Sequence, residues 1–583
     1  MRRFLPFLQW LPTYKKRWFA KDMVAGLTVG ILLVPQGMAY AMIAGMPPVY
    51  GLYAALVPIL IYAFLGTSRQ LAVGPVAMDS LLVAAGLGTL ALTGVESYIA
   101  MALLLAFMVG VIQLALGLFR MGFLANFLSR PVISGFTSAA ALIIIFSQLK
   151  HFFGVNIPQT NQFHKSVINV VLAVPETNGY ALLIGVVGIV MIVLFKRWND
   201  KIPAILSVVV AGIMAVYFFR LEGHGVHIVG NVPEGLPLFS LPEFSWPKIK
   251  GLFSIAIAIA LIGYTEAIGI GKAIEEKNDK ETIDANKELL ALGTANILGS
   301  FFQSYLASAS FSRSAINNAS GAKTPVASLV SMVLVALTLL FFTHLFYYLP
   351  NAALASIIMV SVVGLIDITY PKMLWKYSKD EFVMLLVTFL ITLSVGLPEG
   401  ILLGVLLSLL LMVYRTSKPH FVVLGQIKGS DYYKNVNRFR DDIEFRPDLL
   451  VLRFDSQLYF GNKDYFKKQL FRYIDAKGAG LKGIILNAEP INYIDSTAVE
   501  MLANAIREIH ERGIKFYIAS AIGPTRDIIF NSRIIEELPS EHLFGLTKEA
   551  VDFFDNPDSL TKVGERVAHE SRNIGDQWVS PTK

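Results

Sequence analysis

The chain has 583 residues, of which 54% are hydrophobic and 16% are charged, and this composition excludes a single soluble domain. We therefore predict a polytopic membrane protein. The absence of cysteine excludes disulfides, thiolate catalysis and cysteine-ligated metals. The net charge of +7 does not indicate a nucleic-acid partner, because lysine and arginine beside membrane spans orient a membrane protein.

The first 21 residues are basic and aromatic, and include Arg2, Arg3, Trp10 and Trp18. This mixture predicts a cytoplasmic, amphipathic anchor at the membrane interface over residues 1–21. The apolar run that follows is long and continues directly into further spans. It is therefore not expected to be a cleaved signal peptide.

Fourteen apolar segments follow in two series of seven and predict a transmembrane domain over 22–417. The first series covers residues 22–45, 49–65, 76–90, 98–119, 124–149, 180–195 and 202–219. The second, after a loop rich in proline and glycine, covers 251–275, 285–302, 310–321, 324–349, 352–366, 381–396 and 398–417. In each series the third segment is too short to cross a membrane. Matching broken segments indicate 7+7 inverted repeats with two half-helices and a site at the midplane.

Basic residues predict the orientation of these spans. Those at segment ends on the side of the N-terminus include Arg69, Arg120, Lys272, Lys323 and Arg415. An even number of spans then places both termini, and the domain that follows, in the cytoplasm.

The most unusual stretch of the second series runs from Tyr305 to Thr324, where small and hydroxyl residues surround Arg313. Irregular backbone and a charge at bilayer depth indicate a site that lines a cavity. A half-helix that begins near Ser310 to Ser312 would offer free N–H groups, a positive dipole end and a guanidinium to an anion. We therefore predict half of an anion site here.

The matching stretch of the first series is LAVGPVAMDS, from Leu71 to Ser80, in which Gly74 and Pro75 end an extended segment. If a half-helix begins after Pro75, the backbone N–H groups of Val76, Ala77 and Met78 become anion donors opposite the first set. The alternative is an ordinary helix that is kinked at the proline.

The first span of each series carries a polar insertion, Gln36 in one and Glu266 in the other. Gln36 can donate to an oxyanion without adding charge, and Glu266 is one of very few acids inside a predicted span. Glu266 could exchange a proton as an anion competes for Arg313. The alternative is a permanent structural ion pair between Glu266 and Arg313.

Hydropathy falls after Lys418, and we predict a linker at 418–437, a small α/β domain at 438–555 and a disordered tail at 556–583. The predicted strands are LLVLRFD, GIILNAE and IKFYIAS. The predicted helices are TAVEMLANAIREIHERG and TKEAVDFF. His224 and His227, in the long loop, have no partners at metal-ligand spacing, so no metal site is predicted.

Three stretches carry a resemblance to a known family: residues 34–82, residues 266–302, and SFSRSAINNASGAKT at 310–324. They resemble the sulfate permease (SulP) family, closest to its plant-type proton/sulfate symporters, and the end of the chain resembles a STAS domain. The resemblance implies core and gate domains, elevator-like movement of the core, and a homodimer. It also implies anion contacts and a proton-coupling acid, Glu266. The implied anion contacts are Gln36, Tyr40, Val76, Ala77, Ser312 and Arg313.

Two departures from family patterns bear on the substrate. Sodium-coupled bicarbonate members have a hydroxyl residue one turn after the acid, where this chain has Ile270, which argues against a sodium site. Those members also lack the arginine of SFSRS, so Arg313 favours a more highly charged anion. In the STAS domain the resemblance implies that Ser496 is a regulatory phosphosite, and the alternative is helix capping by Asp495 and Ser496.

The sequence therefore predicts a secondary active anion transporter, in first place a proton-coupled sulfate symporter, without a cofactor and without enzyme activity. We expect the protein to lie in a bacterial inner membrane, in contact with lipid. Transport or exchange of bicarbonate, dicarboxylates or other anions, an anion channel, and a sensor that signals through its STAS domain are the alternatives. No ATPase motif is visible, which is consistent with secondary transport.

Overall fold

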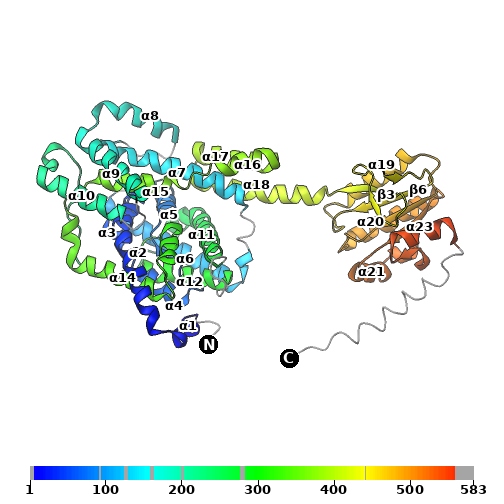
Figure 1. Cartoon of the computed structure of the whole chain (residues 1–583), viewed down its shortest axis with the longest axis horizontal. Coiled ribbons are helices and arrows are strands. Elements are labelled where there is room, and N and C mark those ends of the chain that lie inside the picture. The colour runs from blue at the N-terminus through cyan, green and yellow to red at the C-terminus, as the bar shows by residue number, and fades with distance from the viewer. Residues whose placement is uncertain are drawn as a thin grey trace. The chain divides into compact units, whose positions relative to one another are not determined.

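Helices dominate the first part of the chain, and a mixed sheet with helices forms its end (Figure 1). The computed structural model describes residues 6–88, 90, 94–123, 129–157, 163–198, 203–275, 283–439 and 442–557. The chain divides into two units, Met1–Ser408 and Leu409–Lys583, which we describe separately as the membrane unit and the C-terminal unit.

The membrane unit contains two series of elements, and in each series a short strand is followed directly by a short helix. The first series consists of α1 (Phe7–Trp10), α2 (Lys16–Ile43), α3 (Val49–Tyr53), α4 (Val57–Leu65), β1 (Val73–Gly74), α5 (Ala77–Leu87), α6 (Val95–Leu118), α7 (Arg130–Phe153), α8 (Phe163–Ala173), α9 (Gly179–Trp198) and α10 (Ala204–Phe219). The second consists of α11 (Trp246–Glu275), α12 (Ala285–Ser300), β2 (Ser308–Ala309), α13 (Phe311–Ala319), α14 (Val326–Leu337), α15 (Asn351–Val363), α16 (Thr369–Tyr377), α17 (Lys379–Ser394) and α18 (Leu397–Ser417). Within the described residues, seven helices are long and apolar enough to cross a membrane.

These elements confirm the predicted polytopic helical fold, with local differences in the segments. The first span begins at Lys16, inside the expected anchor, because its helix continues through the basic residues. The segment 49–65 is divided into α3 and α4, and 324–349 leaves regular α-helix after Leu337. Positions 124–128 of the fifth segment lie outside the described residues.

Two groups of helices pack within the membrane unit. In one group α6 lies against α11 and α12, and α2 lies against α14. Glycines permit the close approach: a Cβ on Gly26 of α2 would lie 2.4 Å from the carbonyl oxygen of Ala327, and one on Gly110 would lie 2.8 Å from that of Gly293. The other group contains α7, α9, α15 and α17. We refer to these groups as the core and the gate.

The two half-helices of the core begin at a short crossing of extended chain. β1 and β2 pair antiparallel, with Val73 opposite Ala309 and Gly74 opposite Ser308. α5 and α13 begin within three residues of these strands. Pro75 therefore lies between a strand and a helix, and the alternative of one kinked helix is wrong.

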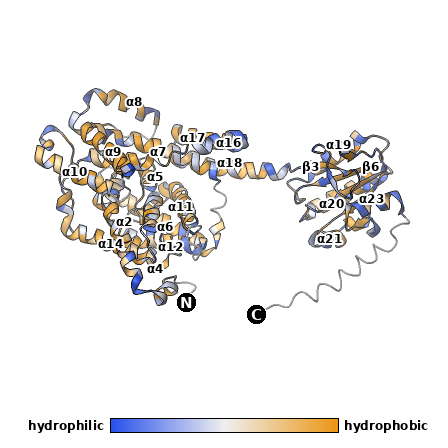
Figure 2. Cartoon of the chain, viewed as in Figure 1, coloured by the Kyte–Doolittle hydropathy of each residue, from blue (hydrophilic) through white to orange (hydrophobic). Residues whose placement is uncertain are grey.

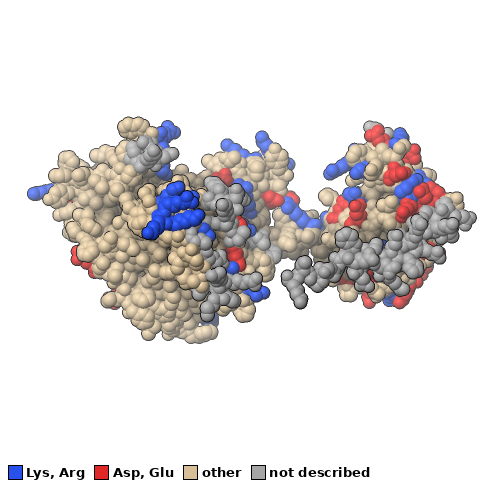
Figure 3. Space-filling model, turned by 60° about the horizontal axis from the view of Figure 1, so that its bottom comes forward, with Lys and Arg blue, Asp and Glu red and all other residues tan. Residues whose placement is uncertain are grey.

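Hydropathy and charge separate the two units. Apolar residues cover the helices of the membrane unit (Figure 2), and charged side chains are sparse over most of its visible face (Figure 3). The C-terminal unit displays both signs of charge interspersed. This contrast is expected when one unit faces lipid and the other faces water.

The C-terminal unit is a sheet with helices. Its strands are β3 (Phe421–Ile427), β4 (Tyr433–Asn435), β5 (Ile443–Glu444), β6 (Leu449–Phe454), β7 (Gly483–Asn487), β8 (Lys515–Ala519) and β9 (Leu543–Phe544). Its helices are α19 (Lys463–Lys477), α20 (Ser496–Glu511), α21 (Gly523–Phe530), α22 (Ile534–Glu537) and α23 (Thr547–Asp555). The strand order is β4-β3-β6-β7-β8-β9, with β5 paired to β3. β6 to β9 are parallel, and β3 is antiparallel to β6.

Apolar side chains alternate between the two faces of this sheet. Leu452 of β6 packs with Phe466 of α19 on one face, and Val451 packs with Val551 of α23 on the other. The three predicted strands and two predicted helices are confirmed. The expected linker, 418–437, instead contains β3 and β4, so only residues 418–420 separate α18 from the sheet. The predicted disorder after residue 557 lies outside the described residues.

Candidate functional site

A cavity of about 540 Å³ lies in the membrane unit between the starts of the two half-helices and the gate. The core side of its wall comes from α2, α5, α11 and α13. The opposite side comes from α7 and α15 of the gate and from α18. Residues of the site that line it are Tyr40, Val76, Ala77, Met78, Glu266, Ser310, Phe311 and Ser312. Most of its remaining lining is apolar, so polar groups at the half-helix starts act in a low dielectric.

Both half-helices present backbone N–H groups to this cavity. In α5 the first bond of the helix runs from the N–H of Ser80 to the carbonyl oxygen of Val76, 3.0 Å away, and no side chain caps the helix. In α13 the hydroxyl oxygen of Ser310 accepts from the N–H of Arg313 at 3.4 Å. The N–H groups of Ala77, Met78, Phe311 and Ser312 precede these bonds, so they have no partner inside their helices. Such helix starts attract anions.

Arg313 is fully buried, with 0% of its surface exposed. Its Nη2 donates to the carbonyl oxygen of Pro75 at 2.8 Å, which ties the start of α13 to the start of α5. Its Nε and Nη1 have no hydrogen-bond partner within the described part of the chain. A buried cation with two unused donors is costly unless an anion compensates it.

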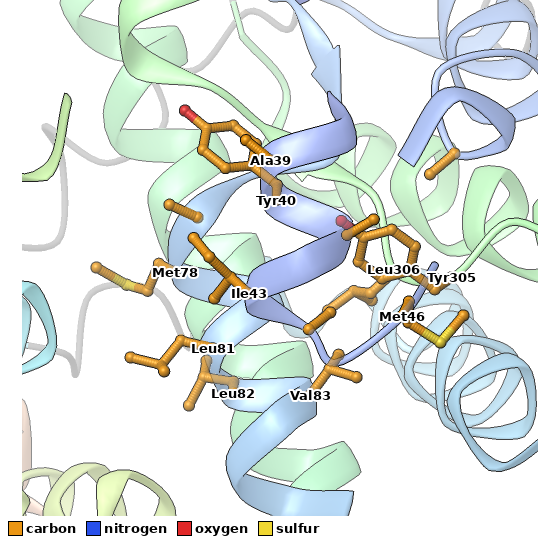
Figure 4. Close-up of a cluster of buried hydrophobic side chains, with 14 of the residues drawn as sticks. Ala39, Tyr40, Ile43, Met46, Met78, Leu81, Leu82, Val83, Tyr305 and Leu306 are labelled. Atoms are coloured by element: carbon orange, nitrogen blue, oxygen red, sulfur yellow. The ribbon is translucent and has the colours of Figure 1, made fainter. Parts of the chain in front are cut away.

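Gln36 and Tyr40 come from the same helix, α2, but only Tyr40 lines the cavity. Gln36 is 4% exposed, and its Oε1 has no partner among the described residues. Figure 4 shows Tyr40 and Tyr305 within a cluster of apolar side chains from α2 and α5. Both tyrosines interact electrostatically with Arg313. The structure therefore brings the predicted residues to one region, with Gln36 and Arg313 buried in it and the others at the cavity.

Glu266 lies on α11 and lines the cavity. Among the described residues it forms no ion pair, and the alternative of a permanent pair with Arg313 is not found. The neighbouring charge that acts on Glu266 is instead a second carboxyl group, that of Asp79. Glu266 is half-buried in the wall of the cavity.

Asp79 is the residue that sequence reasoning missed. It is the third residue of α5, it is 0% exposed, and neither carboxyl oxygen has a hydrogen-bond partner in the part of the chain that the structure describes. The signal was present in LAVGPVAMDS, because an acid inside a membrane segment indicates a site by default.

The predicted regulatory position lies in the C-terminal unit, at the start of α20. Asp495 caps this helix: its carboxylate accepts from the N–H of Ala498 at 2.7 Å and from that of Phe460 at 2.8 Å. Ser496 is the first helical residue, and it is exposed. Asp495 therefore caps the helix, as the alternative to a phosphosite predicted. Ser496 does not, because its side chain makes no capping hydrogen bond among the described residues.

Comparisons with known proteins agree with this arrangement. Residues 19–388 match the sulfate permease family, and residues 440–550 match the STAS domain. The chain belongs to the sulfate permease family. It is 37% identical to "Sulfate transporter 4.1, chloroplastic" of Arabidopsis thaliana, over 94% of this chain and 82% of that protein. It is 33% identical to "High affinity sulfate transporter 1" of Stylosanthes hamata, over 97% of this chain and 86% of that protein.

A solved structure shares the architecture. The murine Solute Carrier 26 family member A9 anion transporter, in the inward-facing state, matches with a TM-score of 0.88 and 29% identity. The match covers 95% of this chain and 94% of the murine chain. Membership of this family places the chain among multi-pass membrane proteins that transport anions, with a STAS domain at its end.

Proposed function

We propose that this protein is a secondary active transporter that symports sulfate with protons. The observation that carries the proposal is Arg313, a buried cation with unused donors at the start of a half-helix. The names of the plant relatives support sulfate as the anion. The protein is accordingly a transporter and not an enzyme.

The proposed anion position lies between the starts of α5 and α13. Backbone N–H groups near Val76, Ala77 and Ser312 would donate to the oxygens of sulfate, and Gln36 and Tyr40 would complete the site. A guanidinium and two helix dipoles favour an anion with two charges over one with a single charge. The arrangement therefore favours sulfate over bicarbonate.

Glu266 is the proposed proton-coupling acid. It lines the same cavity as the half-helix starts, so an arriving dianion raises the cost of its negative charge and favours protonation. The proton and the anion would then travel together. In the proposed elevator movement, the core carries both of them past the opposite wall of the cavity, which is formed by the gate helices α7 and α15 and by α18.

Dicarboxylates are a second candidate substrate, because a cavity of about 540 Å³ exceeds the needs of a single sulfate ion. The proposal includes both termini and the C-terminal unit in the cytoplasm, a position in the cell membrane among lipids, and a homodimer. The predicted place in a bacterial inner membrane belongs to the same proposal.

The test is uptake of labelled sulfate by vesicles that contain the purified protein. We expect accumulation above equilibrium only when the outside is more acidic than the inside. Competition by unlabelled sulfate, bicarbonate and a dicarboxylate identifies the anion. Uptake that reaches equilibrium at the same rate with and without the proton gradient would contradict symport and support a channel or an exchanger.

A further inference from the structure

Asp79 lies opposite α11 in the interior of the core. A Cβ on Gly263 of α11 would lie 3.7 Å from Oδ2 of Asp79, so this carboxyl group contacts α11 one turn before Glu266. The helices α5 and α11 pack against each other at this place. Asp79 and Glu266 thus form a pair of acids that approach from two different helices.

Among the described residues, no cation forms an ion pair with Asp79 or Glu266. The hydroxyl of Ser308 lies next to the carboxyl group of Asp79 and can donate to it, although this hydroxyl also lies 3.4 Å from the carbonyl oxygen of Gly263. The guanidinium of Arg313 is directed to the carbonyl oxygen of Pro75 instead. A fully buried carboxylate without a cation is unfavourable, and an arriving dianion raises that cost further, so Asp79 gains a proton when sulfate binds.

The charged and titratable groups around Asp79 come from each element packed against α5. α11 contributes Glu266 and α2 contributes Tyr40, while the chain before β2 contributes Tyr305, whose hydroxyl lies 2.9 Å from that of Ser80. α6 contributes the uncharged Gln113, whose Nε2 would lie 3.8 Å from a Cβ on Gly263.

The gate helix α7 completes this set. It carries Lys150, which lines a separate cavity beside Leu81 and Ala84 and does not neutralise Asp79. Among the described residues, Glu266 is therefore the acid that interacts electrostatically with Asp79.

Charge balance then determines how many protons accompany the anion. In the empty site, Arg313 contributes one positive charge and the two acids contribute two negative charges, which sum to −1. Sulfate adds two negative charges, and protonation of both acids removes two. The loaded site again sums to −1, so moving the loaded core costs no more electrostatic energy than moving the empty core.

We propose that Asp79 binds the second of two protons that accompany each sulfate, the first being bound by Glu266. The inference rests on the proposed proton-coupled symport and specifies its stoichiometry. Transport is then electroneutral, because two positive charges cross with one dianion. Removal of either acid leaves one proton per sulfate and makes transport electrogenic.

The experiment measures the limiting accumulation of sulfate in vesicles at a proton gradient of one pH unit and zero membrane potential. Two coupled protons support about 100-fold accumulation and one proton supports about tenfold, because each proton contributes one factor of ten. We expect about 100-fold for the wild type. We expect about tenfold for Asp79→Asn and for Glu266→Gln, and both variants should respond to an imposed potential while the wild type does not.

Glu288→Gln is the matched control, because it makes the same chemical change at another buried carboxyl group of the core. The Glu288 carboxylate already accepts from the hydroxyl of Tyr62 at 2.8 Å and from the N–H of Thr67 at 2.7 Å, and Glu288 is not among the residues that line the cavity. We expect this variant to keep the accumulation of the wild type.

The outcomes separate this inference from the proposed function. No proton-driven accumulation by the wild type would overturn the symport itself. Accumulation of about 100-fold by Asp79→Asn, or about tenfold by the wild type, would overturn the role of Asp79 and leave the symport intact.

If Asp79→Asn does not fold, proton uptake by purified Glu266→Gln on sulfate binding replaces the test. This variant retains Asp79, so we expect uptake of about half that of the wild type, measured by calorimetry in buffers of different ionisation enthalpy. Zero uptake by the folded Glu266→Gln protein would overturn the inference.

Discussion

The two half-helices begin at the same crossing, yet their third residues carry opposite charges. α5 begins with Ala77, Met78 and Asp79, and α13 begins with Phe311, Ser312 and Arg313. An acid suits the positive end of a helix dipole and a cation opposes it. The start of α5 therefore supplies its own negative charge, whereas the start of α13 increases the local positive charge.

This difference assigns separate tasks to the two repeats. α13 attracts the anion by charge at all times, while α5 becomes favourable to the anion only when a proton neutralises Asp79. The start of α20 is the reference for a helix start that binds no anion, because the carboxylate of Asp495 caps it by accepting from the N–H of Ala498. The comparison predicts that changes at α13 affect anion affinity most.

The largest effect is expected from Arg313→Ala. It removes the buried charge and the bond to the carbonyl oxygen of Pro75, and we expect sulfate affinity to fall by at least about 100-fold, since charged hydrogen bonds contribute about 1.5–3 kcal/mol each. The measurement is sulfate binding to purified, folded protein. Lys272→Ala, at the end of α11, is the control for loss of a positive charge and should bind normally. Near-normal affinity in folded Arg313→Ala would end the proposed role of α13.

A smaller effect is expected from Gly74→Ala, at the strand that separates the two half-helices. Gly74 has φ +146°, and a Cβ there would lie 3.4 Å from Nη2 of Arg313. The strain of about 1–2 kcal/mol should displace the guanidinium and weaken sulfate binding by about tenfold. Gly94→Ala provides the control, because Gly94 has φ +87° and no atom of the described residues lies within 4 Å of the added Cβ. Equal losses of affinity in both variants would refute a specific role for the crossing.

The fold could be predicted from the sequence to a large extent, because apolar runs and a change of hydropathy are local signals. The start of the half-helix at Ser310 could also be predicted, because small residues surround a single arginine there. β3 was missed because its apolar residues follow the last membrane helix after only three residues, so the composition changes without a visible linker.

The site was less predictable, because its contacts join residues far apart in the chain. Glu266 was expected beside Arg313, but the acid that acts on it is Asp79 of the other repeat. Periodicity and motif spacing carry no information about which side chain a guanidinium meets. The bond from Arg313 to the carbonyl oxygen of Pro75 could be found only from the folded chain.

A modest effect is expected from Ser310→Ala, which makes the start of α13 uncapped like that of α5. Loss of an N-cap costs about 1 kcal/mol, so we expect a lower thermal stability and a change in sulfate affinity below about fivefold. Ser310→Thr keeps the capping hydroxyl and should restore both values. A loss as large as that of Arg313→Ala would mean that the hydroxyl itself contacts the anion.

The smallest effect is expected at the reference helix, α20. Asp495 already caps it, and Ser496 is exposed at its first turn, so Ser496→Asp adds a negative charge where the helix dipole favours one. We expect transport and thermal stability to stay close to those of the wild type. Asp495→Ala, in contrast, should lose about 1 kcal/mol of stability because two N–H groups lose their acceptor. A large change in transport rate in folded Ser496→Asp would instead support the phosphosite, because phosphorylation also adds negative charge at this position.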